Sequence, residues 1–344
     1  MVAKRPSIKD VAQLAGVAVG TVSNVLNKPE IVSPQTLELV HDAIEQLGFV
    51  RNESARQLRS GASSTIAMVV LDVSNPFFTD LYEGAERFAL EHGYSVHLGN
   101  SGSLREREEK QLAAFEQQRV RGVLLAPIGD VSDDIERLRS HGVSTVLVDR
   151  VVTQTEACFV SFDDVAGGQM ALTHLVQQGH RRIAFAGEIG SLRQVQDRLN
   201  GARQAAAASS PHAVQLTSFA TERLDATSGR EIADHIMTLD AASRPTAIFA
   251  ANDMIALGAL QGFVLGGVRV PEDIALIGFD DIDFAASAAV PLSAIRQPRQ
   301  EMGYAAADLL FRELADLDSG IPHQHKHVTF TPELIVRQSS LKTV

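Results

Sequence analysis

From Thr65 onward the chain alternates short apolar runs, rich in β-branched residues, with segments of helical periodicity. The runs are TIAMVVLDV (65–73), YSVHLGN (94–100), RGVLLAPI (121–128), STVLVDR (144–150), RRIAFAG (181–187), TAIFAAND (246–253) and IALIGFDD (274–281). This alternation predicts parallel sheets flanked by helices, and the strands are too many for one compact sheet. We therefore expect an α/β core of two doubly wound parallel-sheet subdomains.

Several of these runs end in polar groups. They are Asp72 to Asn75, Asp149 and Arg150, Asn252 and Asp253, and Asp280 and Asp281. Ligands of such sheets bind beyond the carboxyl ends of the strands, so these residues predict a ligand site in a cleft. The chain has no phosphate loop, no dinucleotide-binding glycine motif and no nucleophile elbow, which GNSGS (99–103) resembles only superficially. We expect a binding protein, not an enzyme.

The first 50 residues carry a different pattern, of three short helical segments. Apolar stripes comprise Ile8, Val11, Ala12 and Ala15, then Val22, Val25 and Leu26, then Leu37, Val40, Ile44 and Leu47. Ser7 with Asp10 resembles a capping box, Ser33 and Pro34 begin the third helix, and Gly16 and Gly48 are helix stops. A tight turn between the first two helices predicts a helix-turn-helix domain over 1–50, whose second helix enters the DNA major groove. A small bundle used for protein contacts is the alternative.

The net charge of -11 is distributed unevenly. Residues 1–62 hold seven Lys and Arg against six Asp and Glu, while the remainder holds 24 against 36. Cations gather at Lys4, Arg5 and Lys9 and again at Arg51, Arg56 and Arg59. The N-terminal module can therefore meet phosphates locally, and the acidic remainder would repel DNA.

The stretch PSIKDVAQLAGVAVGTVSNVLN closely resembles the N-terminal signature of LacI-family transcriptional repressors. The resemblance continues through VSPQTLELVHDAIEQLGFVRNESARQLRSG and extends to about residue 338. It implies a homodimeric regulator that binds double-stranded operator DNA and has a core like that of periplasmic binding proteins. It also implies a small-molecule effector bound between the core subdomains, in the same cleft that the strand ends predict.

The resemblance assigns DNA contacts to the second helix of the first module. Val19 and Gly20 match the family's specificity pair, and Thr21, Ser23 and Asn24 match further contacts. Val19 and Gly20 offer no side-chain hydrogen bond, so we expect Val19 to contact a thymine methyl and Gly20 to allow close approach of the backbone.

The chain departs from the family at two positions of this motif. Many members carry Ser where this chain has Ala18, and the loss of that N-cap costs about 1 kcal/mol unless another group satisfies the amides. Many also carry Arg where this chain has Asn24. Asn24 can pair with adenine instead of guanine, or remain a solvated helix residue.

Residues 51–63 are expected to form a hinge helix and linker. The segment NESARQLRS (52–60) is too short to be a helix alone in water. In the resembling family this helix forms when two copies pair over the minor groove, and Leu58 matches a leucine that wedges into a base step. Arg56 and Arg59 lie beside it as further DNA-binding residues. The alternative is a flexible linker.

The resemblance also implies an effector pocket. Asp149, Arg198, Asn252 and Asp280 match positions that hold ligand hydroxyls. Carboxylates accept from hydroxyls and Arg198 can donate to two oxygens, so a neutral polyol, a sugar or sugar derivative, would satisfy them. Other expected pocket residues are Arg150 and the ring faces of Phe77, Phe78 and Phe162. As alternatives, Phe78 is core, Asp280 caps a turn, and Arg150 pairs with Asp149 or solvent, whereas Asp253 is expected to be a helix N-cap outside the pocket.

We place the N-terminal core subdomain at 64–162 and 293–326 and the C-terminal one at 163–292 and 327–344. The ending SSLKTV has no heptad tail, which favours a dimer. No signal peptide or membrane span is evident, so we expect a cytoplasmic protein without a membrane partner. A solute-binding transport component and an enzyme on the same sheets are the competing interpretations.

Metal chemistry receives little support from the sequence. The single cysteine, Cys158, excludes an intramolecular disulfide, gives no pair for a zinc site and is expected to be a small buried hydrophobe. HQHKH places His323, His325 and His327 on one face if extended, but no carboxylate or thiolate lies beside them in the sequence. We expect a solvated loop, no metal and no cofactor.

Overall fold

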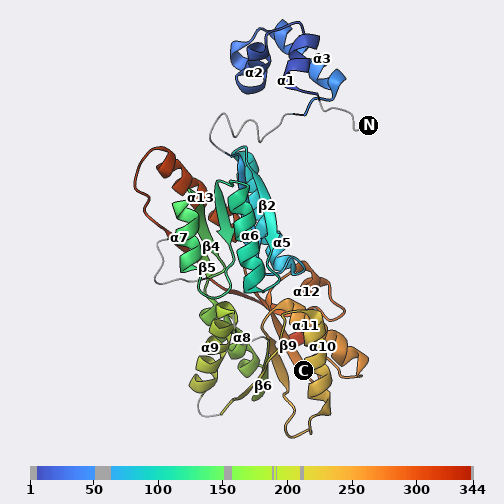
Figure 1. Ribbon diagram of the computed structural model, residues 1–344. Coiled ribbons are helices and arrows are strands. Elements are labelled where there is room, and N and C mark those ends of the chain that lie inside the picture. The colour runs from blue at the N-terminus through green and yellow to red at the C-terminus, as the bar shows by residue number, and fades with distance from the viewer. Residues whose placement is uncertain are drawn as a thin grey trace. The chain divides into compact units, whose positions relative to one another are not determined.

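The computed structural model describes residues 6–50, 63–150, 157–187, 190, 192–209 and 213–341. The chain forms two compact units, Met1–Ser63 and Ser64–Val344, and each is described by itself. Figure 1 labels their helices and strands. Within the described ranges, no helix is both long enough and apolar enough to cross a bilayer.

The first unit contains the three predicted helices. They are α1 (Ile8–Leu14), α2 (Val19–Asn27) and α3 (Pro34–Leu47), with a short 3-10 turn, η1 (Pro29–Ile31), between the last two. Their shared core is made of Val11, Ala12, Val22, Val25, Val40 and Ala43, all buried. The apolar stripes of the sequence therefore face one another, and the three-helix arrangement is confirmed.

The ends of these helices follow local sequence chemistry. Asp10 Oδ2 accepts hydrogen bonds from both the amide and the hydroxyl of Ser7, each at 2.7 Å, at the start of α1. Ser33 Oγ accepts from the Thr36 amide at 3.3 Å, and Gly48 ends α3 with φ of 59°. Ala18 is the N-cap of α2 and makes no side-chain hydrogen bond there. The structure therefore confirms that α2 begins without a side-chain N-cap.

The second unit begins with a six-stranded sheet in the order β11-β5-β4-β3-β1-β2. Its strands are β1 (Thr65–Val70), β2 (Ser95–Asn100), β3 (Gly122–Leu125), β4 (Ser144–Val148), β5 (Cys158–Phe162) and β11 (His327–Phe330). All neighbouring pairs are parallel. Helices α5 (Pro76–Glu91) and α13 (Arg299–Asp318) cover one face, and α6 (Arg105–Gln117) and α7 (Ser132–Ser140) cover the other.

A second six-stranded sheet has the order β12-β10-β9-β8-β6-β7. Its strands are β6 (Arg182–Ala186), β7 (Gln215–Phe219), β8 (Ala247–Ala250), β9 (Ala275–Asp280), β10 (Ser293–Arg296) and β12 (Glu333–Ile335), of which only β12 is antiparallel to its neighbour. Helices α8 (Asp164–Gln177) and α9 (Arg193–Ala208) cover one face, and α10 (Ala226–Thr238) and α11 (Asp253–Leu265) cover the other. Two short helices, α12 (Asp283–Ser287) and η2 (Gln338–Ser340), complete this subdomain.

The chain passes from one sheet to the other three times, after β5, after β10 and after β11. The expected subdomain boundaries at 293 and 327 need correction at two of these passages. Strand β10 pairs with β9, although 293–296 was assigned to the N-terminal subdomain, and β11 pairs with β5, although 327–330 was assigned to the C-terminal one. Each strand is only four residues long, so its own sequence carries too little periodicity to select a sheet.

Candidate functional site

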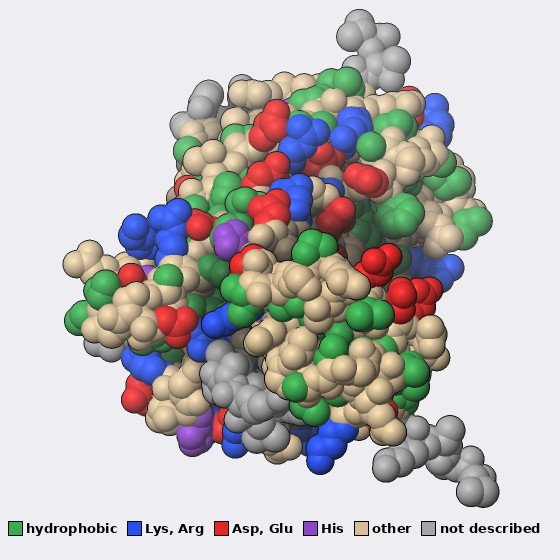
Figure 2. All heavy atoms as spheres, turned by 90° about the horizontal axis from the view of Figure 1, so that it is seen from above, with side chains coloured by type: hydrophobic (Ala, Val, Ile, Leu, Met, Phe, Trp, Pro, Cys, Tyr) green, Lys and Arg blue, Asp and Glu red, His purple; other side chains and the backbone are tan. Residues whose placement is uncertain are grey.

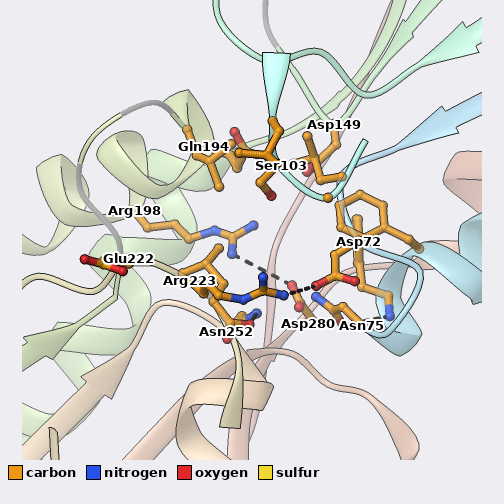
Figure 3. A pocket seen from close by; sticks show the side chains of 17 residues that line it. Asp72, Asn75, Ser103, Asp149, Gln194, Arg198, Glu222, Arg223, Asn252 and Asp280 are labelled. Atoms are coloured by element: carbon orange, nitrogen blue, oxygen red, sulfur yellow. Dashed lines mark hydrogen bonds and ion pairs between the residues drawn. The ribbon is translucent and has the colours of Figure 1, made fainter. Parts of the chain in front are cut away.

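A cavity of about 330 Å³ lies where the carboxyl ends of the strands of both sheets meet. The first sheet contributes Leu71, Asp72, Asn75, Phe77, Phe78, Gly102, Ser103, Leu104 and Asp149, and the second contributes Leu192, Gln194, Arg198, Glu222, Arg223, Leu224, Asn252 and Asp280. Figure 3 shows the polar side chains of this set arranged around the cavity. The site thus lies at the edge that the topology of such sheets favours.

Arg198, on α9, is the buried cation of this cavity. Its side chain is only 4% exposed, and Nε donates to Asp164 Oδ1 at 2.7 Å. Nη1 donates to the carbonyl oxygen of Ala251 at 2.7 Å and lies 3.8 Å from Asp280 Oδ1. The guanidinium also lies 3.7 Å from the centre of the Phe279 ring, a favourable cation–π geometry. These contacts hold the Arg198 head in one orientation.

The close packing of α8 on α9 sets the position of Arg198. A Cβ at Gly168 would overlap the carbonyl oxygen of Arg198, and a Cβ at Gly201 would overlap that of Val165. Asp164 lies one helical turn before Gly168, so the same close approach brings its carboxylate to the guanidinium. The two glycines therefore allow the short separation between α8 and α9 at which Asp164 can pair with Arg198.

Two strand-end carboxylates face this cation from the two sheets. Asp149, which follows β4, accepts a hydrogen bond on Oδ2 from Gln194 Nε2 at 3.2 Å, whereas its Oδ1 has no partner among the described residues. Burial raises the pKa of Asp149 well above its usual range, and Arg198 opposes that shift. Burial likewise raises the pKa of Asp280, whose Oδ1 accepts from Gln297 Nε2 at 2.8 Å. A ligand that donates hydrogen bonds would lower the cost of keeping these carboxylates charged.

Asn252 has a structural task as well as a place on the cavity wall. It is the N-cap of α11, where its Oδ1 accepts from the Ile255 amide at 2.9 Å. Its Nδ2 donates to the carbonyl oxygen of Leu224 at 3.2 Å. The expectation that Asp253 caps this helix was wrong: Asp253 is the first residue of the helix, buried, and its Oδ2 accepts from the Ile282 amide at 2.8 Å.

The structure brings six of the eight expected effector residues to the cavity: Phe77, Phe78, Asp149, Arg198, Asn252 and Asp280. Phe77 and Phe78 pack edge to face at 4.9 Å between ring centres. Arg150 and Phe162 do not line the cavity. The Arg150 guanidinium donates to the carbonyl oxygen of Gly129, and Phe162 lies in the core with its ring edge against Phe279 at 5.7 Å.

Gln194 and Arg223 line the cavity but were not predicted from the sequence. Gln194 lies four residues before Arg198 on α9, and that spacing would have placed it on the same helix face. Arg223 and Asp72 lie 3.7 Å apart and come from different sheets. A local sequence pattern cannot predict the ion pair between Arg223 and Asp72, because the two residues are far apart in sequence.

The DNA contacts expected on α2 lie on the surface of the first unit. Val19 is 40% exposed, Gly20 and Asn24 are exposed, and Thr21 and Ser23 are half-buried. A Cβ on Gly20 would meet no atom within 4 Å, so no packing within this chain requires a glycine. Arg56, Leu58 and Arg59 lie outside the described residues. On the face drawn in Figure 2, basic side chains lie among acidic ones, and neither sign gathers into a large field over the described atoms.

The expected solvated loop around the histidines is wrong for two of the three. His323 Nε2 lies 3.2 Å and His325 Nδ1 lies 3.8 Å from the Cys158 sulfur. Glu313 and Asp316, both on α13, also lie next to these residues. The third residue, His327, begins β11 and stacks on Phe159 with ring centres 3.9 Å apart. The thiol and the carboxylates are distant in sequence, which is why the local pattern did not reveal them.

Comparisons with known proteins agree with this architecture. Residues 7–52 match the family described as bacterial regulatory proteins, lacI family, and residues 172–340 match a periplasmic binding protein-like domain. The chain is 31% identical over 342 residues to the HTH-type transcriptional repressor PurR of Aliivibrio fischeri strain MJ11, an alignment that covers 97% of this chain and 98% of that protein.

Solved structures are similar over nearly the whole chain. A complex of the transcriptional regulator CelR with cellobiose has 31% sequence identity and a TM-score of 0.68, covering 97% of this chain and all of that one. The Lac repressor dimer bound to operator and the anti-inducer ONPF has 26% identity and a TM-score of 0.80, covering 98% and 100%. The two-sheet core and the helical N-terminal unit therefore occur together in the neighbours as they do here.

Proposed function

Because the chain belongs to the lacI family of bacterial regulatory proteins, we propose that it is a cytoplasmic, homodimeric transcriptional repressor controlled by a neutral sugar-like effector. The observation that carries this proposal is the presence, in one chain, of the exposed helix α2 and of a polar cavity between two sheets. One element meets operator DNA, and the other binds the molecule that changes operator affinity.

The first residues of α2 would recognise DNA bases with few side-chain hydrogen bonds. Val19 contacts a thymine methyl, and Gly20 lets the backbone approach the base edges. Thr21, Ser23 and Asn24 supply polar contacts from the next turn. Asn24 is exposed and offers the amide pair that suits adenine.

The hinge assignments complete the DNA-binding surface as proposals about residues 51–63. Leu58 inserts into the minor groove at a flexible base step and kinks the duplex, while Arg56 and Arg59 contact phosphates. Leu58→Ala should reduce operator affinity and the DNA bend together. Unchanged affinity and an unchanged bend, measured by gel mobility with phased sites, would remove the wedge from this proposal.

The charge arrangement of the cavity favours a neutral effector over an anionic one. Both cations on its wall are already paired: Arg198 with Asp164 and Asp280, and Arg223 with Asp225 at 2.8 Å. Asp149 Oδ1 is a buried acceptor without a partner among the described residues, and it calls for a hydrogen-bond donor such as a hydroxyl. The similar CelR was solved with cellobiose, which agrees with this chemistry.

The size of the cavity favours a compact ligand. Its volume of about 330 Å³ lies near the lower end of the roughly 300–1,000 Å³ typical of ligand pockets. Phe77 and Phe78, at the start of α5, give the wall an apolar ring surface beside the carboxylates. A sugar ring offers both an apolar face and peripheral hydroxyls, so one molecule can use both parts of the wall.

Effector and DNA are coupled through the relative position of the two sheets. The Gln194 to Asp149 hydrogen bond and the Arg223 to Asp72 ion pair each join residues of different sheets. A ligand that rearranges these contacts changes how far the sheets close. The effector and the operator then alter each other's affinity by the same factor.

A homodimer follows from the same proposal. The similar Lac repressor was solved as a dimer on its operator. A two-fold dimer binds a pseudo-palindromic operator with one α2 per half-site. The edge strand β2 leaves Leu98 39% exposed, and Leu90 and Leu104, in the adjoining segments, are more exposed still. Light scattering after size exclusion measures the mass directly, and a monomer at micromolar concentration would contradict this part.

One titration tests the central proposal. Labelled DNA from beside the protein's own gene and a scrambled duplex are titrated with protein by fluorescence anisotropy, at fixed salt. Each titration is repeated with a panel of mono- and disaccharides and a panel of purine bases and nucleosides. We expect tight binding of one native fragment and a shift of at least about tenfold, 1.4 kcal/mol, with a sugar.

The other outcomes separate the parts of the proposal. If no native fragment binds more tightly than scrambled DNA with any ligand, the repressor function is wrong. If only a purine shifts operator binding, the regulator stands and the sugar assignment falls. Chemical change of the bound ligand, followed by mass spectrometry, would indicate an enzyme instead.

A further inference from the structure

Four side chains with metal-binding atoms meet at the far end of the first sheet from the effector cavity. Cys158 is the first residue of β5, Glu313 is on α13, and His323 and His325 lie in the segment between α13 and β11. In Figure 1 this segment is the loop that leaves the end of α13 and turns back toward the sheet. One donor atom from each of the four residues lies within 4.8 Å of the others.

The two sulfur-to-nitrogen distances in this group are close to those of a tetrahedral zinc site. Zinc binds sulfur at about 2.3 Å and imidazole nitrogen at about 2.0–2.1 Å, so its tetrahedral donors are roughly 3.3–3.6 Å apart. The Cys158 sulfur lies 3.2 Å from His323 Nε2 and 3.8 Å from His325 Nδ1. Both distances lie within a few tenths of an ångström of the tetrahedral edges.

The cluster also has the outer contacts that orient metal ligands. His323 Nδ1 lies 2.8 Å from Asp316 Oδ2, which directs Nε2 toward the sulfur. A carboxylate on the remote nitrogen is the usual second-shell partner of a zinc-bound histidine. The amide of Lys326 donates to the Cys158 sulfur at 3.2 Å, a contact that favours a thiolate. These interactions fix the donors in position from outside the cluster.

Two donors of this group that can carry a negative charge are shielded from solvent. Cys158 and Glu313 are both buried, and Glu313 Oε2 makes no hydrogen bond among the described residues. A neighbouring cavity of about 290 Å³ is lined by Glu313, His323 and His325, so space adjoins the donors. A thiolate and a carboxylate with two neutral imidazoles carry two negative charges, which one divalent cation neutralises.

We propose that Cys158, Glu313, His323 and His325 bind one Zn²⁺ ion. Four protein donors fill a tetrahedral shell and leave no position for a substrate, so the ion has a structural role. The ion would connect the segment after α13 to the amino end of β5. This is the end of the sheet at which β1 also begins. This inference does not depend on the proposed function.

A cobalt titration tests the site in the full-length, tag-free protein after chelator treatment and dialysis. Co²⁺ should bind at one equivalent and produce both the absorption of a tetrahedral ion and a thiolate-to-metal charge-transfer band. Zn²⁺ should abolish both and, by competition, bind more tightly. Elemental analysis of the reloaded protein should give one zinc per chain.

Variants separate this site from adventitious binding. Cys158→Ala should lose the charge-transfer band, and His323→Gln should lose stoichiometric binding. Asp316→Asn alters only the outer contact of a partly exposed carboxylate, so the protein should fold while zinc affinity falls about 10- to 100-fold. His327→Ala is the matched control, since this histidine lies in the same HQHKH stretch but packs on Phe159.

The proposal is overturned if Co²⁺ gives no charge-transfer band in the wild-type protein, or if Cys158→Ala binds the ion as the wild type does. It is also overturned if His327→Ala weakens binding as much as Asp316→Asn. Circular dichroism of each chelated variant shows whether it is folded. The Asp316→Asn result decides the question even if Cys158→Ala does not fold.

Discussion

Gln194 on α9 donates a hydrogen bond to Asp149 at the end of β4, with 3.2 Å between Nε2 and Oδ2, and so joins the two sheets across the cavity. The other oxygen of Asp149 has no partner among the described residues. One carboxylate therefore contacts the opposite subdomain and still offers an acceptor to a ligand. In the proposed function, Asp149 would therefore link ligand binding to closure of the two sheets.

Asp149→Asn should weaken effector binding by about 1–1.5 kcal/mol, the difference between a hydrogen bond to a charged acceptor and one to a neutral amide oxygen. Asn tolerates the left-handed backbone at this position, where φ is 59°. Operator affinity without effector should change little. Isothermal titration with the sugar found in the operator screen measures the loss.

Asp234→Asn is the control for that variant, since Asp234 is an exposed residue of α10 away from the cavity. It should bind effector as the wild type does. An equal loss in the two variants would mean that overall charge, and not a contact of Asp149, sets effector affinity.

Gly20→Ala should change stability and DNA affinity in opposite directions. Nothing within 4 Å would meet the new Cβ, and alanine favours a helix over glycine by roughly 0.8–1.0 kcal/mol. The N-terminal unit should therefore unfold at a higher temperature, while operator binding weakens because the methyl group prevents close approach. If operator affinity rose along with stability, Gly20 would have no role at the DNA.

Ala18→Ser should stabilise the first unit by about 1 kcal/mol, since Ala18 is an N-cap without a side-chain hydrogen bond. Urea unfolding monitored by circular dichroism measures the gain. A second variant, Ala18→Val, adds volume without a cap and should give no such gain. Equal stabilisation by both would contradict the capping explanation.

Val19→Ala and Arg56→Ala should affect operator binding in different ways. Loss of the Val19 methyl contact should change base preference at one position of each half-site. Loss of the Arg56 charge should weaken all sequences about equally and reduce the salt dependence by about one ion. Binding to a library of single-base operator variants at two salt concentrations distinguishes the two patterns, and a uniform loss for Val19→Ala would contradict its assignment to base recognition.

The carboxyl of Asp164 predicts a pH dependence with a definite sign. Burial raises its pKa from 3.8 to about 6, in spite of the opposing Arg198. Between these values the folded chain holds more protons than the unfolded chain, so this group lowers the free energy of unfolding as pH rises toward and through about 6.

Urea unfolding of the wild type and of Asp164→Asn at pH 5, 6 and 7 measures that contribution as a difference. The wild type should lose more stability from pH 5 to 7 than the variant does. The difference is required because His174, whose pKa is lowered by burial, acts in the opposite direction. Parallel pH profiles would show that Asp164 does not titrate in this window.

The parts of the fold that depend on local sequence periodicity could be predicted. All seven apolar runs became strands, because β-branched residues and the intervening helical pattern agree over many positions. The short strands β10 and β11 were assigned to the wrong subdomains. Which sheet a four-residue strand joins depends on the path of the neighbouring chain, and the strand itself does not encode it.

The site shows the same limit at the level of single residues. Strand ends identified Asp149, Asn252 and Asp280, since the carboxyl edge of a parallel sheet collects such groups. Arg150 follows Asp149 directly, and successive side chains at a strand end point in different directions, so only one of them lines the cavity.

Pairings distant in sequence could not be predicted at all. Arg223 with Asp72, and His323 with Cys158, join residues that only the tertiary structure brings together. The family resemblance did not supply them either, because it assigned no role to Arg223 or to the histidines.

The three passages of the chain between the sheets have a mechanical consequence. The passages after β5 and after β11 are joined to each other, because the amide of Asp163 donates a hydrogen bond to the carbonyl oxygen of Phe330 at 3.0 Å. A single tether would leave the subdomains free to swivel, whereas several tethers resist torsion and leave bending as the soft motion. In the proposed regulator, the coordinate that an effector would change is therefore the opening angle between the two sheets, and a single such coordinate suits a two-state switch.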